Sequence, residues 1–123
     1  MADIGIKRVY DRESRRDGRR FLVERLWPRG IRKEDLHVES WLRDVAPSTT
    51  LRKWYGHDVS RWPEFRQRYR KELDANEDAW RPLLDAARHG QVTLLYAARD
   101  EAHNSALVLR NYLARKLQRR GKR

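Results

Sequence analysis

The chain has 123 residues, the length of one domain, which can bury roughly two-thirds of the surface that its unfolded form exposes. Its 29 lysines and arginines against 18 acidic residues give a formal charge of +11, which indicates anionic partners and not a fold. Cysteine is absent, which excludes disulfides, thiolate nucleophiles and cysteine-ligated metal sites. No stretch has the apolar core of a signal peptide or the roughly 20 apolar residues of a membrane span, so we expect a cytoplasmic protein with no membrane partner.

Two strands are predicted near the start of the chain. Residues 4–10 alternate apolar and polar side chains, as a half-buried strand does. After a turn signal at Asp17-Gly18, the segment "RFLVERL" (20–26) is rich in apolar residues, as a strand covered on both faces would be. The following "LWPRG" predicts a type I turn with Pro28 in its second position and Gly30 in its fourth.

Helical patterns follow the second strand. Apolar residues spaced i, i+3, i+4 and i+7 predict a helix over 34–45 that ends at Pro47. Ser48 is expected to cap a short helical turn, and Gly56 suits the end of that turn.

Two longer helices are predicted over 60–75 and 79–89. In the first, aromatic and aliphatic residues form one stripe, and Pro63 is tolerated in the first turn. The second is expected to be capped by Asp78 and to end at Gly90.

The most convincing strand is "VTLLYAA" (92–98), a continuous apolar run that is too short for a helix. Helical spacing resumes over 101–117, and the basic residues 118–123 are expected to form a disordered tail outside a single domain of residues 1–117. Buried strands separated by helices predict an α/β fold, with a small, mostly parallel sheet of three or four strands and helices on both faces.

Ligands of open parallel sheets bind beyond the carboxyl ends of the strands. Two loops with arginines are expected there, one carrying Arg25 and Arg29 and the other Arg99. Asp100 is a plausible cap of the following helix, whose free amides would add to a cradle for phosphate or carboxylate. The alternative is that Arg29 and Arg99 are solvated surface residues and that Arg25 pairs with a carboxylate such as Asp100.

Several segments of the chain resemble, in order and spacing, the YeaO-like branch of the family called domain of unknown function 488. These segments are "RVYD", "LVERLWPRGI", "WLRDVAPSTTLRKWYGHD", "FRQRYRKEL" and "VTLLYAARDEAHNSALVL". The resemblance extends to about residue 115 and implies a single α/β domain in a soluble bacterial protein. The wider family often has a Cys-His-Arg triplet after the last strand. Here the triplet is Ala102-His103-Asn104, so thiol chemistry cannot be carried over.

With this resemblance, the predicted cleft also includes Trp27, His103 and Asn104. The middle segment adds four candidates, which are Ser48, Arg52, Trp54 and His57. Ser48 is more simply explained as a helix cap than as a nucleophile, and Trp54 as a core residue than as a stacking platform. His103 beside Asp100 is a candidate general acid–base pair, although a partly exposed first-turn histidine is the simpler explanation of His103.

No cofactor or metal is predicted. The four histidines lack the paired spacing of metal ligands, and the glycine-rich fingerprints of nucleotide-binding loops are absent. The first functional hypothesis is therefore a protein, and on one reading an enzyme, that acts on a small phosphate- or carboxylate-bearing ligand. The alternatives are a basic protein that binds nucleic acid, and an adaptor domain.

Overall fold

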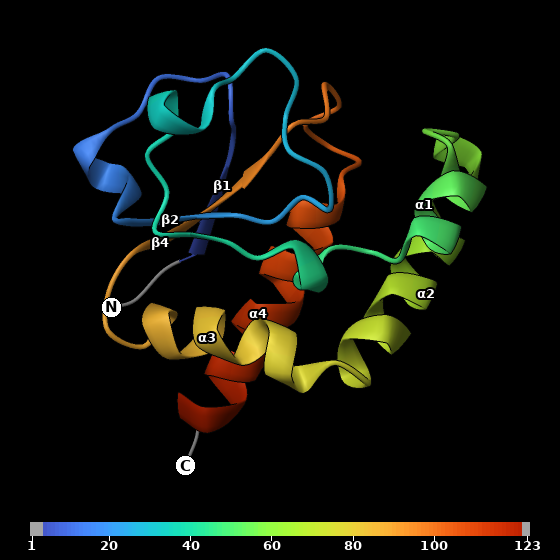
Figure 1. The fold of residues 1–123 in the computed structure, drawn as a ribbon. Helices are drawn as coiled ribbons and strands as arrows, with labels where there is room; N and C mark the ends of the chain where they lie inside the picture. The colour runs from blue at the N-terminus through green and yellow to red at the C-terminus, as the bar shows by residue number, and fades with distance from the viewer. Residues whose placement is uncertain (1–3, 122–123) are drawn as a thin grey trace.

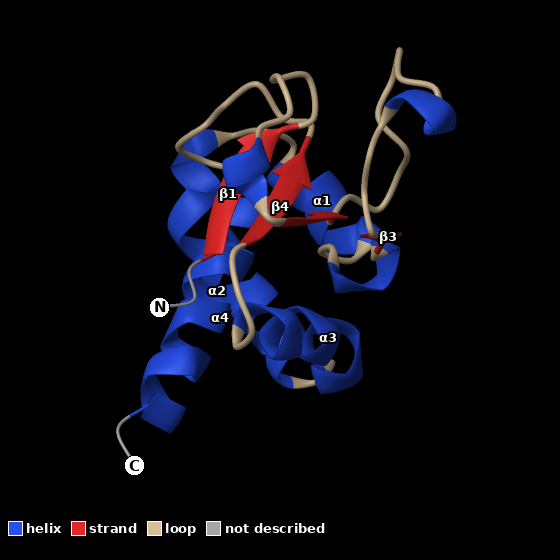
Figure 2. Ribbon diagram, turned by 90° about the vertical axis from the view of Figure 1, so that its left-hand side faces the viewer, coloured by secondary structure: helices blue, strands red, loops and turns tan. Residues whose placement is uncertain are grey.

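The core of the fold is a parallel sheet with the strand order β1-β4-β2-β3. It is seen in a computed structural model that describes residues 4–121. The strands are β1 (Ile4–Arg8), β2 (Arg19–Leu22), β3 (Ser40–Trp41) and β4 (Val92–Tyr96). All three strand pairs are parallel, so the carboxyl ends of the strands lie at one edge, toward which the β1 and β4 arrows point in Figure 2. The predicted α/β class and parallel sheet are confirmed.

Strand β4 lies between β1 and β2 in the sheet, and every one of its residues is buried. Its Val92 pairs with Ile4 of β1 on one side and with Arg19 of β2 on the other. Side chains alternate along a strand, so Leu94 packs in the larger hydrophobic cluster and Leu95 in a smaller cluster on the opposite face.

All four α-helices pack on one face of the sheet (Figure 1). They are α1 (Thr49–Tyr55), α2 (Trp62–Asp74), α3 (Glu77–Ala87) and α4 (Ser105–Gly121). The prediction of helices on both faces was wrong, because the small cluster around Leu22 and Leu95 is covered by loop residues such as Trp27, Ile31 and Val38. Within residues 4–121, no helix combines the length and apolarity needed to cross a bilayer.

The helix predicted over 34–45 is not formed. The segment instead makes two 3-10 turns, Lys33–Asp35 and Arg43–Val45, with the short strand β3 between them. Its apolar side chains divide between two clusters, with Val38 and Trp41 on the loop-covered face and Leu42 and Val45 on the helical face. A helix would turn them all to one side. Hydrogen bonds to the free edge of β2, such as Leu42 N to the Leu22 carbonyl at 2.8 Å, favour the extended form.

Helix boundaries follow the caps that the chain provides. Ser48 caps α1 as predicted, since its side chain accepts a hydrogen bond from the Leu51 amide, and Gly56 ends the helix in a left-handed conformation with a φ of 52°. The predicted cap of α3 was wrong, because the helix begins at Glu77 after Asn76 and Asp78 lies within its first turn.

The last helix is displaced relative to its predicted range. Helix α4 begins at Ser105 and not at 101. It continues to Gly121, so residues 118–121 are helical where a disordered tail is predicted, consistent with the helix-forming tendency of Gln and Arg. Residues 122–123 of that tail lie outside the described residues.

Candidate functional site

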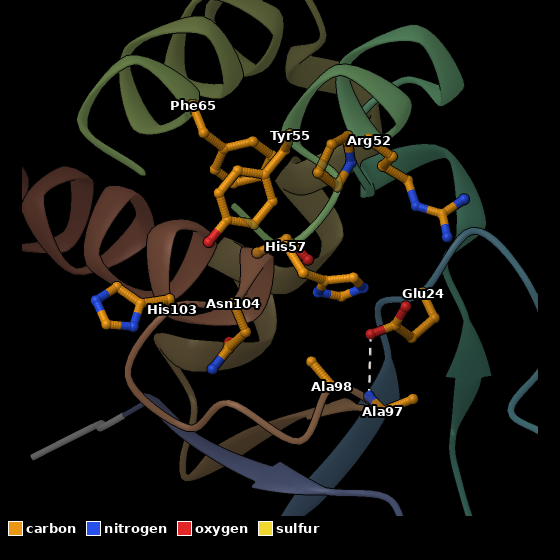
Figure 3. A pocket seen from close by; sticks show the side chains of 11 residues that line it. Glu24, Arg52, Tyr55, His57, Phe65, Ala97, Ala98, His103 and Asn104 are labelled. Carbon is orange, nitrogen blue, oxygen red and sulfur yellow. Dashed lines mark hydrogen bonds between the residues drawn. The ribbon is translucent and has the colours of Figure 1, made fainter. Parts of the chain in front are cut away.

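A cavity of about 300 Å³ lies at the carboxyl edge of the sheet, on its helical side (Figure 3). Glu24 follows β2, and Ala97 and Ala98 follow β4, so the sheet supplies its floor. The remaining wall comes from the start of α1, the region from α1 to α2, and the start of α4. Those residues are Pro47, Arg52, Tyr55, His57, Phe65, His103, Asn104 and Ser105. The site is therefore where open parallel sheets bind their ligands.

Arg52 and His57 bring cationic and hydrogen-bonding groups to the cavity from one helical segment. Within residues 4–121, neither side chain makes a hydrogen bond or an ion pair. His57 directly follows the Gly56 cap and itself has a φ of 61°, a value that non-glycine residues rarely adopt. Such strained conformations concentrate at functional sites, and this one directs the imidazole ring toward Glu24 (Figure 3).

Glu24 is the acidic group of the cavity. Its Oε2 accepts a hydrogen bond from the Ala97 amide at 3.0 Å, which joins the ends of β2 and β4. Burial raises the pKa of this carboxyl group, although the Ala97 hydrogen bond and the positive charges of Arg52 and His57 oppose the rise. The carboxylate is thus held in an environment that favours proton binding or a further hydrogen-bond donor.

His103 and Asp100, the predicted acid–base pair, lie together. The His103 Nδ1 is 2.9 Å from an Asp100 carboxylate oxygen, and the ring packs edge-on against Trp62 with centroids 5.3 Å apart. Hydrogen bonds from the Ala102 amide, the His103 side chain and the His103 amide together outweigh desolvation and lower the pKa of Asp100. Asp100 therefore remains an anion that orients the ring, and the catalytic role of the pair stays a prediction.

The predicted cap at the start of α4 is wrong. Asp100 is not the cap of α4; its carboxylate accepts from the amides of Ala102 and His103, at 2.9 and 3.0 Å. Helix α4 is capped by Asn104, whose side-chain oxygen accepts from the Leu107 amide at 2.9 Å and whose amide nitrogen donates to the carbonyls of residues 100 and 101. The amides of Ala102, His103 and Leu107 are therefore satisfied by the chain itself.

The three arginines on which the cleft prediction rested do not line the cavity. Arg25 donates to the carbonyls of Pro47 and Ala46 at 3.1 and 2.9 Å, so it anchors the loop before α1, and it pairs with no carboxylate in the described part of the chain. Arg29 and Arg99 are exposed. The predicted turn is also shifted by one residue, with Arg29 and Gly30 at its centre and Gly30 at a φ of 77°.

Three other predicted residues lie outside the cavity. Trp27 belongs to the cluster on the opposite face, where it packs edge-on against Trp41. Ser48 is occupied by capping and donates its hydroxyl to Glu72 at 2.6 Å. Trp54 is partly exposed and lies against the guanidinium groups of Arg61 and Arg68.

Four predicted residues do line the cavity, namely Arg52, His57, His103 and Asn104. The lining residues that the sequence prediction missed include Glu24 and the aromatic wall of Tyr55 and Phe65, whose ring centroids are 4.6 Å apart. Glu24 had a signal, because it is the one acidic residue in the apolar run "FLVERLW". Within residues 4–121, no three histidine, aspartate or glutamate side chains are grouped as metal ligands would be.

Comparison with known proteins places the chain in a family. The family model described as the inactive DUF488-N3 subclade matches residues 3–123. The chain belongs to the DUF488-N3 family. This DUF488-N3 chain is also 44% identical to the uncharacterized protein YeaO of Escherichia coli K12 over 111 residues, which are 90% of this chain and 96% of that protein.

Mycobacterial proteins are also similar to this DUF488-N3 chain. The uncharacterized protein Rv3073c of Mycobacterium tuberculosis H37Rv is 42% identical over 110 residues, which are 89% of this chain and 92% of that protein. The uncharacterized protein Mb3100c of Mycobacterium bovis has the same identity and the same shares of both chains. No solved structure matches significantly. The expected resemblance to the YeaO-like branch is therefore confirmed for nearly the whole chain.

Proposed function

We propose that the protein binds a small phosphate- or carboxylate-bearing ligand in the cavity at the carboxyl edge of its sheet. One observation carries the proposal. The side chains of Arg52 and His57 line the cavity, and neither has a hydrogen-bond partner among residues 4–121. Arginine is well suited to bind carboxylate and phosphate oxygens, because its planar guanidinium donates two parallel hydrogen bonds.

The dimensions and walls of the cavity fit a small ligand. A volume of about 300 Å³ is at the lower end of typical small-molecule sites. The rings of Tyr55 and Phe65 form an apolar wall, and the polar groups converge from separate segments of the chain. Such a combination of apolar wall and few polar groups is typical of small-molecule sites.

Membership of this family favours a protein that binds its ligand without converting it. The matching subclade is described as inactive. The chain also has no cysteine, and Ala102 stands before His103 where the resemblance to the wider family implies a Cys-His-Arg triplet. An acid–base reaction by His103 and Asp100 is a secondary proposal, for which a substrate bound at Arg52 would have to reach the free Nε2 atom of the ring.

Thermal unfolding with and without anions tests the proposal. A ligand that binds the folded state stabilises it by about 2.7 kcal/mol at roughly 100 times its Kd. We expect phosphate, phosphomonoesters or small carboxylates to raise the Tm of the wild type by several degrees and that of Arg52→Ala far less. Lys53→Ala is the matched control, because it removes the same charge from an exposed neighbouring position outside the cavity. Equal shifts for the two variants would contradict the proposed site.

Nucleic-acid binding is a second proposal, carried by the charge of +11 and by arginines on the outside of the helical layer. Arg61 and Arg68 lie 5.3 and 4.4 Å from the ring centroid of Trp54, and such a surface can contact a phosphate backbone. The double variant Arg61→Ala/Arg68→Ala should then lower the affinity for single- and double-stranded oligonucleotides and flatten its dependence on salt. Arg52→Ala should leave that affinity unchanged, which separates the two proposals.

A further inference from the structure

The cavity holds an acceptor as well as donors, and the acceptor is incompletely satisfied. One oxygen of Glu24 accepts from the Ala97 amide. The other has no partner among residues 4–121, and since no buried side-chain oxygen there lacks a partner, this oxygen must be accessible. It is accessible from the cavity, because Glu24 lines it (Figure 3). A ligand that fills the cavity must therefore meet a carboxylate oxygen.

The donors and the acceptor lie close together. Figure 3 shows the Arg52 guanidinium and the His57 ring on the side of the cavity where the Glu24 carboxylate lies. Both side chains act electrostatically on that carboxylate. A ligand anion held by Arg52 and His57 therefore lies beside a second negative group, and its affinity depends on how the two negative groups meet.

Two oxyanions without a proton repel each other, and a carboxylate without its charge partner is costly to desolvate. A donor on the ligand removes both penalties, because the carboxylate accepts its hydrogen and the anionic oxygens remain free for Arg52 and His57. An unpaired acceptor in a site is a strong means of rejecting ligands that lack the matching donor.

We infer that Glu24 makes the cavity selective for ligands that carry a hydrogen-bond donor beside their anionic oxygens. This inference rests on the proposed function. Two kinds of ligand carry such a donor. In a protonated phosphate it is the P–OH group, and in a 2-hydroxycarboxylate it is the hydroxyl group. Sulfate and simple carboxylates of the same size have the anionic oxygens without the donor, so they should bind less well.

Isothermal titration of the full chain at pH 7.5 tests the selectivity with two matched pairs of probes. Inorganic phosphate is compared with sulfate, which has the same tetrahedral shape and no proton at this pH. Lactate is compared with propionate, which lacks only the hydroxyl group. We expect the donor-bearing member of at least one pair to bind about tenfold more tightly, the effect of one charge-assisted hydrogen bond. The pair that shows the preference identifies the source of the donor.

Glu24→Gln assigns the selectivity to the carboxylate. The amide has the same shape but is uncharged and carries its own donor, so it can bind either member of a pair. We expect the tenfold preference to fall below about twofold, while the affinity for sulfate or propionate rises. Glu39→Gln, at an exposed position outside the cavity, should retain the preference of the wild type.

The outcomes separate this inference from the proposed function. If wild-type protein binds both members of each pair equally, the selectivity is refuted while anion binding stands, and this comparison does not depend on any variant being folded. An unchanged preference in folded Glu24→Gln also refutes the role of Glu24. If no probe binds, or if Arg52→Ala binds as tightly as the wild type, the proposed function itself fails.

Discussion

Replacing Asp17 with asparagine should destabilise the protein by about 3 kcal/mol. Asp17 is only 5% exposed and lies on the loop-covered face of the sheet. Its carboxylate accepts hydrogen bonds from Lys7 Nζ at 2.6 Å, from Arg20 Nη1 at 2.5 Å and from the Ser14 amide at 3.0 Å. It is thus the common acceptor that joins β1, the 3-10 turn before β2, and β2 itself.

The magnitude follows from what asparagine would leave behind. Removing one partner of a buried ion pair costs about 3–5 kcal/mol, because the other charge remains buried without compensation. Arg20 is 7% exposed and would be left without an anionic partner among residues 4–121. Asparagine has the same shape and can still accept from the Ser14 amide, so we expect the lower end of that range. Against a total stability of about 5–15 kcal/mol, the change is large.

Urea unfolding at pH 7 measures this change. Glu39→Gln is the control, because it removes one charge from an ion pair with Arg19 that is exposed on both sides and should leave the midpoint nearly unchanged. A loss of less than about 1 kcal/mol for Asp17→Asn would refute the reasoning, since it would mean that the buried network contributes no more than an ordinary surface substitution.

The same variant should alter the response to acid. Burial raises the pKa of Asp17, but the hydrogen bonds from Lys7, Ser14 and Arg20 outweigh it, so the pKa in the folded protein lies below the ordinary value of an aspartate. The folded state therefore binds a proton less readily than the unfolded chain. The contribution of Asp17 is fully present above the unfolded pKa of about 3.9 and is lost as the pH falls through the folded value. The stabilities of wild type and Asp17→Asn should converge on acidification below about pH 4, and a constant difference would contradict this linkage.

Two further predictions concern single positions, each with a matched control measured by the same urea assay. Gly18 has a φ of 64°, and an added Cβ would lie 2.3 Å from the backbone oxygen of Gln91, so Gly18→Ala should cost about 3 kcal/mol or more. Gly30→Ala, at a φ of 77° with open space around it, should cost only about 1 kcal/mol, and equal costs would exclude the steric explanation. The buried Tyr69 hydroxyl donates to the Val45 carbonyl at 2.6 Å, so Tyr69→Phe should cost about 1–3 kcal/mol by leaving that oxygen unpaired. Tyr10→Phe removes an exposed hydroxyl with a similar bond to the Arg29 carbonyl and should cost less than about 0.5 kcal/mol; a comparable loss would show that burial does not set the cost.

The elements that the sequence predicted well are those that local patterns determine. Strand β4 is an apolar run that is buried on both faces, and α1 begins at Ser48 and ends at Gly56 because these residues satisfy its terminal groups. The periodicity of α2 places Phe65 and Tyr69 in the core. In each case the residues that decide the structure lie within a few positions of one another along the chain.

The segment 34–45 could not be predicted in the same way, because its structure depends on a distant partner. Its spacing fits a helix, but β2 offers an open row of backbone groups, and Trp41 adds a hydrogen bond from its ring nitrogen to the Glu24 carbonyl at 2.7 Å. Val38 and Leu42 then reach opposite faces of the sheet. Tertiary hydrogen bonding of this kind overrides a local pattern.

The candidate site was likewise predicted only in part, where local patterns determine it. The sequence pointed to the edge of the sheet at which the cavity lies, and to Arg52, His57 and His103, which line that cavity. It could not show which polar side chains would be occupied by hydrogen bonds within the protein and which would be left to face the cavity. Arg25 binds the carbonyls before α1, and Glu24, its neighbour, turns to the cavity, a distinction that depends on where Ala46 and Ala97 lie in space.

The satisfied helix ends also change how an anion must be held. Amides at a helix start often bind phosphate, but here Asp100 and Asn104 occupy the amides of Ala102, His103 and Leu107. Binding then depends on side chains, above all on the guanidinium of Arg52, which has no hydrogen-bond or ion-pair partner among the described residues. The aromatic wall and the Glu24 carboxylate would still receive a ligand in Arg52→Ala, yet nothing on the floor of the site would replace the lost charge. A single substitution should therefore remove most of the affinity, whereas a site built on helix amides would retain much of it.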